Sequence, residues 1–137
     1  MITYRSGNWK YQLIDAVEFK IPEFVLLVDG VSTGHISLED GILRIAAGYS
    51  WDGASGPVID RDSTKRASLA HDALYQLMRA DLVDREEWKR PADRVFRRLC
   101  IEDGVWKWLA KAYCMGLDAF GRTATLRDQR RPVMTAP

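Results

Sequence analysis

The chain changes character near residue 50, and this change limits the folds that it can adopt. Before it, residues 11–21 and 23–29 are rich in Val, Ile, Leu and Phe, which favours β-strands. Pro22 and Gly30 break these two expected strands. After it, apolar residues recur with a helical spacing. The two halves predict an α+β fold, with N-terminal antiparallel β hairpins or a small sheet followed by a bundle of three to four helices.

Turn signals are strongest between residues 35 and 63. In HISLEDGILRIAAGY, residues 35–49, alternating apolar residues flank Asp40-Gly41, a dipeptide that accepts the positive φ angles of a tight hairpin turn. The next segment, SWDGASGPVIDRDS at residues 50–63, has two glycines, one proline and three aspartates. We therefore expect a hairpin and then a loop with unusual backbone demands.

The helical half contains several start signals. Ser63 or Thr64 can cap a first helix that runs to about Ala80. Asp84 can cap a second helix, and a third can begin with Pro91 in its first turn.

A last helix is expected after Gly104, which ends the third, and before Gly121. Trp106 and Trp108 fall on different sides of it, and we expect at least one of them in the core. Its apolar residues form a stripe that predicts a buried face: Val105, Trp108, Leu109, Ala112 and Met115.

The length of 137 residues favours a single domain over residues 1–137. Its expected parts are a β-rich part at about residues 1–50, a Gly/Asp loop at 51–62, a helical part at 63–121 and a loose tail at 122–137.

Composition excludes several classes. The net charge of +1 gives no overall field toward nucleic acid. Two cysteines without CxxC spacing give neither a zinc signature nor a disulfide framework. The chain has no run like that of a signal peptide and none as long as a membrane span, so we expect a soluble protein.

One histidine interrupts the apolar stripe of the first helix. Residues three and four apart share a helical face, so His71 aligns with Ala67, Leu74, Tyr75 and Met78. Asp93 has the same place on the later helix, beside Phe96, Arg97 and Cys100. If the two stripes pack together, His71 and Asp93 lie within hydrogen-bond reach, at the base of a cleft lined by residues 50–57.

Such a pair has two interpretations. A carboxylate that accepts from one imidazole nitrogen fixes the tautomer, and the other nitrogen can take a proton from water as a general base. Alternatively, a buried His71 merely satisfies a buried Asp93, with Asp93–Arg97 as an ordinary helical ion pair.

The loop adds candidate metal ligands. Gly53, Ser55 and Gly56 lie in a stretch able to turn backbone carbonyls inward, and such carbonyls with one carboxylate suit calcium. Asp72, next to the candidate base, is the natural carboxylate. A calcium ion there would polarise a carbonyl substrate, and the Gly53 N–H could help to hold an oxyanion.

The order of these motifs resembles a family of phage and prophage proteins. The motifs AGYSWDGASGP, ASLAHDALY, ADRVF and Phe120-Gly121 are similar to those of a domain of unknown function (number 1353), over roughly residues 20–122. The resemblance implies a viral origin, a place in the host cytoplasm or the virion, and other phage proteins as partners. It implies no particular activity.

A narrower resemblance concerns the glycine loop, HDxxY and the distant aspartate, which are similar to the active site of phospholipase A2, particularly the disulfide-poor viral kind. It implies that His71 is the base and that Tyr75 and Asp93 orient it. It also implies a calcium site formed by one carboxylate and loop carbonyls: Asp72, Trp51, Gly53 and Ser55. Asp52 is a further candidate metal ligand.

Three functions remain open. The first is a calcium-assisted lipid or ester hydrolase, with phospholipid or a membrane surface as partner. The second is another metal-dependent hydrolase, of phosphodiester or peptide bonds, that uses Asp52, His71, Asp72 and Asp93. The third is a non-catalytic phage protein with a structural, assembly or host-interaction role. The motifs HExxH, GxSxG and a Walker loop are absent, which disfavours the enzyme classes that they mark.

Overall fold

The computed structural model describes residues 2–7, 10–27, 29–53, 58, 60–120 and 125–126. In chain order, the elements are β1 (Tyr4–Gly7), β2 (Lys10–Leu13), β3 (Val17–Lys20), the 3-10 helix η1 (Pro22–Phe24), β4 (Val31–Thr33), β5 (Ile36–Glu39), β6 (Ile42–Ile45), β7 (Ser50–Trp51), α1 (Asp62–Arg79), α2 (Arg85–Glu102) and α3 (Lys107–Phe120). The expected α+β arrangement is confirmed. The expected loose tail lies almost wholly outside the described residues.

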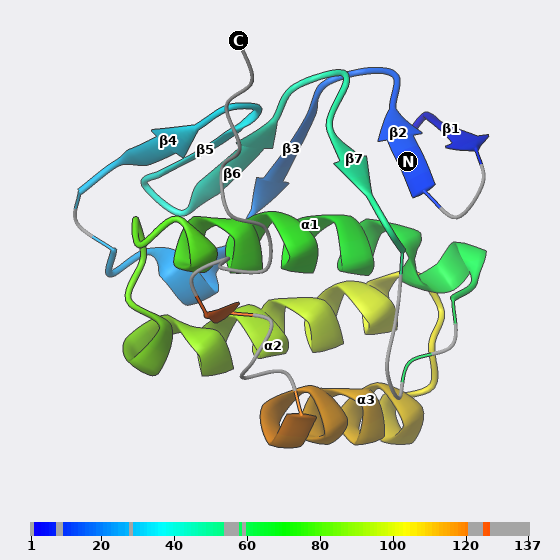
Figure 1. Ribbon diagram of the computed structural model, residues 1–137. Helices are drawn as coiled ribbons and strands as arrows, with labels where there is room; N and C mark the ends of the chain where they lie inside the picture. Colours follow the sequence, from blue (N-terminus) through cyan, green and yellow to red (C-terminus); the bar gives the residue numbers. More distant parts are fainter. Residues whose placement is uncertain are drawn as a thin grey trace, which may run out of the picture.

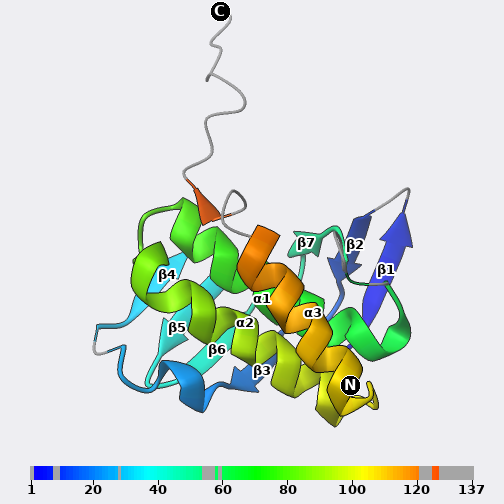
Figure 2. The ribbon, with the colours of Figure 1, turned by 90° about the horizontal axis from the view of Figure 1, so that it is seen from below.

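The strands form two small antiparallel sheets on one side of the helices (Figure 1). One sheet has the order β1-β2-β7 and the other the order β3-β6-β5-β4. Beneath them α1 packs along α2, and α3 packs on α2 as the outermost helix (Figures 1 and 2). A continuous hydrophobic core joins residues of both sheets to residues of the helices.

The hairpin at Asp40-Gly41 forms as predicted. Asp40 has φ 54° and Gly41 has φ 72°, the left-handed conformation that this two-residue turn requires. The turn sets Glu39 opposite Ile42 and carries the pairing to Ile36 opposite Ile45.

The strand expected at residues 23–29 is wrong. The segment begins with the 3-10 helix η1, because Pro22 fixes its own φ and has no N–H to donate to a sheet. Phe24 is buried and stacks on Trp88 of α2, with 4.9 Å between ring centroids. Val25 and Leu26 are exposed.

The second and third expected helices are one helix, α2, with Pro91 inside it. Asp84 caps its start as predicted, accepting from the Glu86 N–H at 3.4 Å, and the chain leaves its end through Gly104 at φ +101°. A proline inside a helix costs about 3 kcal/mol through the lost hydrogen bond and crowding. Packing of α2 along α1 offsets that cost, since Trp88 and Pro91 are themselves buried.

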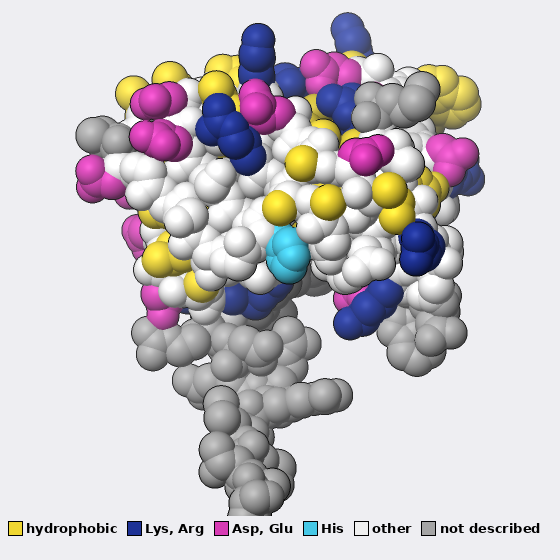
Figure 3. Space-filling view, turned by 90° about the horizontal axis from the view of Figure 1, so that it is seen from above, with side chains coloured by type: hydrophobic (Ala, Val, Ile, Leu, Met, Phe, Trp, Pro, Cys, Tyr) yellow, Lys and Arg dark blue, Asp and Glu magenta, His cyan; other side chains and the backbone are white. Residues whose placement is uncertain are grey.

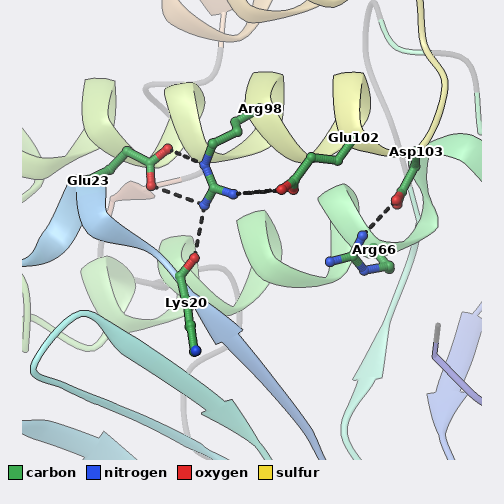
Figure 4. Close-up of polar contacts among 6 residues, drawn as sticks. All are labelled: Lys20, Glu23, Arg66, Arg98, Glu102 and Asp103. Atoms are coloured by element: carbon green, nitrogen blue, oxygen red, sulfur yellow. Dashed lines mark hydrogen bonds and ion pairs between the residues drawn. The ribbon is translucent and has the colours of Figure 1, made fainter.

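Arginines tie the layers together (Figure 4). The Arg98 guanidinium of α2 donates to the Glu23 carboxylate at 2.7 and 3.2 Å and to the Lys20 carbonyl at 3.0 Å. Arg66 of α1 donates to the Asp103 carboxylate at 2.6 Å, at the end of α2. These contacts fix the helices relative to each other and to the strands.

The buried face expected on the last helix is only partly right: Val105 and Leu109 pack against the core, whereas the other three expected residues are exposed. Trp106 and Trp108 are 68% and 65% exposed, and Met115 is 62% exposed. The buried face of α3 is instead formed by Ala110, Tyr113 and Cys114. The helix is apolar on nearly every side, so periodicity alone could not choose which side is covered. Within the ranges that the structure describes, no helix has the length and apolarity to cross a membrane.

Candidate functional site

The packing of α1 against α2 brings His71 and Asp93 together. The imidazole Nε2 lies 2.7 Å from Asp93 Oδ1. Asp93 is fully buried and His71 is 6% exposed. Because Asp93 is a carboxylate, the Nε2 nitrogen is the donor and the imidazole carries its proton there. This geometry fixes one tautomer of the ring.

Two further side chains bind the Asp93 carboxylate. The Tyr75 hydroxyl, one turn after His71 on α1, donates to Oδ1 at 2.5 Å. The Lys89 ammonium, one turn before Asp93 on α2, donates to Oδ2 at 2.8 Å. Burial alone would raise the pKa of Asp93, but interactions with His71, Asp118 and Lys89 hold that pKa well below its usual range. Asp93 is therefore a charged, fully bonded carboxylate inside the protein.

Lys89 is a site residue that sequence reasoning missed. Its ammonium also donates to the carbonyls of Leu117 at 2.8 Å and Asp118 at 3.3 Å, so it joins the site to α3. The ion pair expected between Asp93 and Arg97 is wrong, because the partner of Asp93 is on the preceding turn. Lys89 and Arg97 are both four residues from Asp93, so spacing could not decide between them.

The remaining nitrogen of His71 is Nδ1. It makes no hydrogen bond to the described residues, and no fully buried side-chain nitrogen or oxygen among them lacks a partner. Nδ1 is therefore not fully buried, in a side chain that is 8% exposed as a whole. The rings of Tyr75 and Phe96 pack around the imidazole, at centroid distances of 3.9 and 5.4 Å. The ring is therefore held at Nε2, and Nδ1, which no described residue bonds, can accept a proton.

Asp118 is a second residue that sequence reasoning missed. Its carboxylate lies 3.8 Å from the Lys89 ammonium. Burial raises the pKa of Asp118 to about 6, and the neighbouring Asp93 raises it too. Asp118 lies far from the HDxxY motif in the chain and reaches the site only because α3 packs on α2.

Asp72 points away from the His71–Asp93 pair, toward residues around β7. Burial raises the pKa of Asp72 to about 6, and the Asp52 carboxylate adds to that rise, whereas His71, Arg79 and a hydrogen bond from the Asp52 backbone lower it. Two of the candidate metal ligands, Asp52 and Asp72, are therefore neighbours. No group of three His, Cys, Asp or Glu side chains suited to a metal gathers within the described ranges.

We expect the stability of the protein to rise as the pH falls from about 7 to about 5. The carboxyls of Asp72 and Asp118 have pKa values raised to about 6, above the ordinary value of about 4. In that window the folded chain binds protons that the unfolded chain does not, which favours folding. Thermal melts test this, with a double Asp72→Asn, Asp118→Asn variant as the flat control. A wild-type melting temperature that falls steadily over the window would contradict it.

Gly53 lies against a different carboxylate. It has φ +80°, and a Cβ placed on it would lie 2.6 Å from the Tyr11 ring and 2.9 Å from both oxygens of Asp60. Asp60 accepts from the Tyr11 hydroxyl at 2.6 Å and from the Lys65 ammonium at 2.7 Å. A glycine is needed here both for the conformation and for the close approach.

Replacing Gly53 with Ala should destabilise the fold by about 1–3 kcal/mol, through backbone strain and the clash with Tyr11. Gly34→Ala is the matched control, because Gly34 also has positive φ (+50°) but no atom within 4 Å of its added Cβ. Denaturant unfolding of both variants measures the difference. Equal losses would show that the contacts of Gly53 contribute nothing beyond its φ.

The other candidate ligands are placed in part. Trp51 lies in β7, paired with Tyr11 of β2, and its buried indole donates to Ser68 Oγ at 3.1 Å. Ser55 lies outside the described residues, as does the whole second half of the loop at 50–57, so the expected cleft stays a prediction. Comparisons with known proteins give no match, whether to family models, curated proteins or solved structures.

Proposed function

We propose that the protein is a hydrolase of lipid or ester bonds in which His71 is the general base, oriented by Asp93. The observation that carries this proposal is the different bonding of the two imidazole nitrogens of His71. Nε2 is held at 2.7 Å by a buried carboxylate, and Nδ1 is not fully buried and makes no hydrogen bond to the described residues. A general base needs a fixed ring and a free lone pair, and this arrangement supplies both.

In the reaction that we propose, Nδ1 takes a proton from water as the water oxygen attacks the carbonyl carbon of the ester. The imidazolium then donates that proton to the oxygen of the leaving alcohol as the carbon–oxygen bond breaks. Asp93 stabilises the positive ring through Nε2–H in between. The Tyr75 hydroxyl, at 2.5 Å from the same carboxylate oxygen, keeps that oxygen in place.

Lys89 limits what Asp93 can contribute. The carboxylate is already neutralised by an ammonium at 2.8 Å, so it gives less electrostatic stabilisation to the imidazolium than an unpaired carboxylate would. We therefore give Asp93 chiefly the role of fixing the tautomer and the ring position. Gly53 has a structural role in this proposal, because the Asp60 carboxylate beside it disfavours an oxyanion.

Asp72 and Asp52 fit a calcium ion as its carboxylate ligands. They are neighbours: burial is the main cause of the raised pKa of Asp72, and the Asp52 carboxylate adds a smaller repulsion that a divalent cation would relieve. Hard oxygen ligands of this kind suit calcium, which takes six to eight of them. A bound calcium would polarise the carbonyl of the substrate.

Calcium is expected to raise the melting temperature of the wild-type protein and not that of Asp72→Asn. A ligand at 100 times its dissociation constant stabilises a fold by about 2.7 kcal/mol, an effect that a melt resolves. Paired melts in calcium and in chelator measure it, with Asp118→Asn as the control, because it removes another carboxyl of raised pKa away from Asp52. Equal shifts in wild type and Asp72→Asn would show that Asp72 is not a ligand.

A non-catalytic role is the second candidate, and the saturation of Asp93 favours it. Three donors bind this carboxylate, from two helices, and Lys89 extends the network to the third. Such a network stabilises helix packing without any chemistry. A metal-dependent hydrolase of phosphodiester or peptide bonds has less support. It would need His71 and Asp72 at one metal ion, but the His71 imidazole bonds Asp93.

A panel of phospholipids and simple esters, assayed with calcium and with chelator, tests the proposal. We expect turnover that requires His71. Absence of turnover on every substrate, in a folded protein supplied with calcium, would overturn the hydrolase proposal in favour of the structural role.

A further inference from the structure

Helix α3 presents an uncovered apolar face. Trp108, Ala112, Met115 and Ala119 are spaced by four, three and four residues, so they lie on one side of the helix, and all four are exposed. The exposed Trp106 ring lies 5.9 Å from that of Trp108 and extends the face at its start. We call these five residues the apolar stripe.

A row of arginines runs beside the apolar stripe on α2. Arg90, Arg94 and Arg97 are spaced by four and three residues and therefore share one side of that helix. This side is near α3. Burial raises the pKa values of Cys114 and Asp118 on α3, and the charges of Arg94 and Arg97 partly offset that rise at Cys114, as the charge of Arg90 does at Asp118. Figure 2 shows α2 and α3 side by side on this surface of the molecule.

Two lysines of α3, Lys107 and Lys111, are exposed beside the same stripe. Together with the three arginines they make up the basic rim. None of the five cations makes a hydrogen bond or ion pair with another residue in the described part of the chain. Acidic residues also lie near the rim: Glu86 and Glu87 are one turn before Arg90, and Asp118 lies near Lys89.

The opposite surface of the molecule is different. Over the strands, Lys and Arg are interspersed with Asp and Glu (Figure 3). There Arg44 pairs with Glu18 at 3.2 Å. Among the described residues, the exposed tryptophans lie on the α2–α3 surface beside the cations of the basic rim, although the net charge of the chain is only +1.

We propose that the apolar stripe and the basic rim dock the protein on an anionic lipid membrane, with α3 lying in the plane of the interface. Tryptophan is favoured at the level of the headgroups, where its ring is apolar and its N–H is wet. Amphipathic helices with such a face sink into the boundary between headgroups and acyl chains. Each unpaired Lys or Arg near an anionic leaflet adds to the attraction.

This inference goes beyond the proposed function, because docking needs no catalysis. Two other occupants fit less well. A second copy of the chain would bring two basic rims together, and like charges repel. A nucleic acid would use the rim but would leave most of the apolar stripe, above all Met115 and the two alanines, without a partner.

The test is sedimentation of the full chain with vesicles of phosphatidylcholine, with or without phosphatidylserine, at low and high salt. We expect binding that requires phosphatidylserine and weakens with salt. Arg94→Glu should weaken it more than about fivefold, since one basic residue contributes about 1 kcal/mol near an anionic surface. Trp108→Glu should weaken it at least as much, and Met115→Glu repeats the test if the first variant fails to fold.

Matched controls come from the rest of the surface. Leu26→Glu changes an 81% exposed apolar residue outside the stripe, and Lys20→Glu reverses an exposed cation outside the rim. Both should leave binding unchanged. His71→Gln should also bind vesicles like wild type. A failure of the hydrolase proposal is therefore distinguishable from a failure of the docking proposal.

Three results would overturn the inference. The first is no binding to phosphatidylserine vesicles at low salt. The second is equal weakening by the controls. The third is a dimer that Trp108→Glu dissociates, or a nucleic acid complex that Arg94→Glu dissociates, with no vesicle binding in either case.

Discussion

Replacing His71 with Gln is expected to lower hydrolysis of the best substrate about 10²–10⁴-fold, the range that general-base assistance contributes. Glutamine can still donate an N–H to Asp93, so the buried carboxylate keeps a partner where Nε2 now lies. It cannot accept a proton at neutral pH, so the loss reports the chemical step. The pH profile of wild-type activity should depend on His71, so the residual activity of the variant should not follow that profile.

His35→Gln is the matched control, because His35 is the only other histidine in the sequence and is exposed on the loop between β4 and β5. It should have wild-type activity. Steady-state rates with a melt of each variant separate chemistry from stability. A His71→Gln variant with full activity would overturn the role of His71, and one that only melts earlier, in a protein without turnover, would support the structural role.

The local signals of the sequence were sufficient for much of the fold. Asp40-Gly41 predicts its hairpin because only a few residues accept two successive positive φ angles. Asp84 predicts a helix start because its carboxylate can bond the free N–H groups there. Local signals were misleading at Pro91, which was expected to begin a helix but lies inside α2. The local cost of a proline inside a helix is outweighed there by the packing of α2 against α1, which the sequence does not show.

Only the His71–Asp93 pair of the candidate site was predictable from the sequence. His71 and Asp93 are each the polar member of an apolar stripe, and two stripes that pack bring such members together. Lys89 and Asp118 were out of reach for a physical reason. Lys89 competes with Arg97 at equal spacing from Asp93, and Asp118 depends on where α3 lies. Because α3 is apolar on almost all sides, its sequence leaves that placement open.

Asp93→Asn should destabilise the protein by about 3–5 kcal/mol, the cost of removing one partner of a buried ion pair. The variant keeps the shape of the side chain but removes the nearer counter-ion of the Lys89 ammonium, which is 12% exposed and keeps only Asp118 at 3.8 Å. The loss should be largest near neutral pH. The lowered pKa of Asp93 means that its stabilisation is present above pH 4 or so and disappears as the pH falls below that.

A double-mutant cycle isolates the pair. Lys89→Met removes the cation, and the double variant with Asp93→Asn should lose less than the sum of the two single losses. Recovery will be incomplete, because Lys89 also bonds the Leu117 and Asp118 carbonyls at the end of α3. Arg97→Met is the control, equally far from Asp93 in sequence but not its partner, and its effect should simply add to that of Asp93→Asn. Coupling to Arg97 in place of Lys89, measured by denaturant unfolding, would show that Arg97 and not Lys89 is the partner of Asp93.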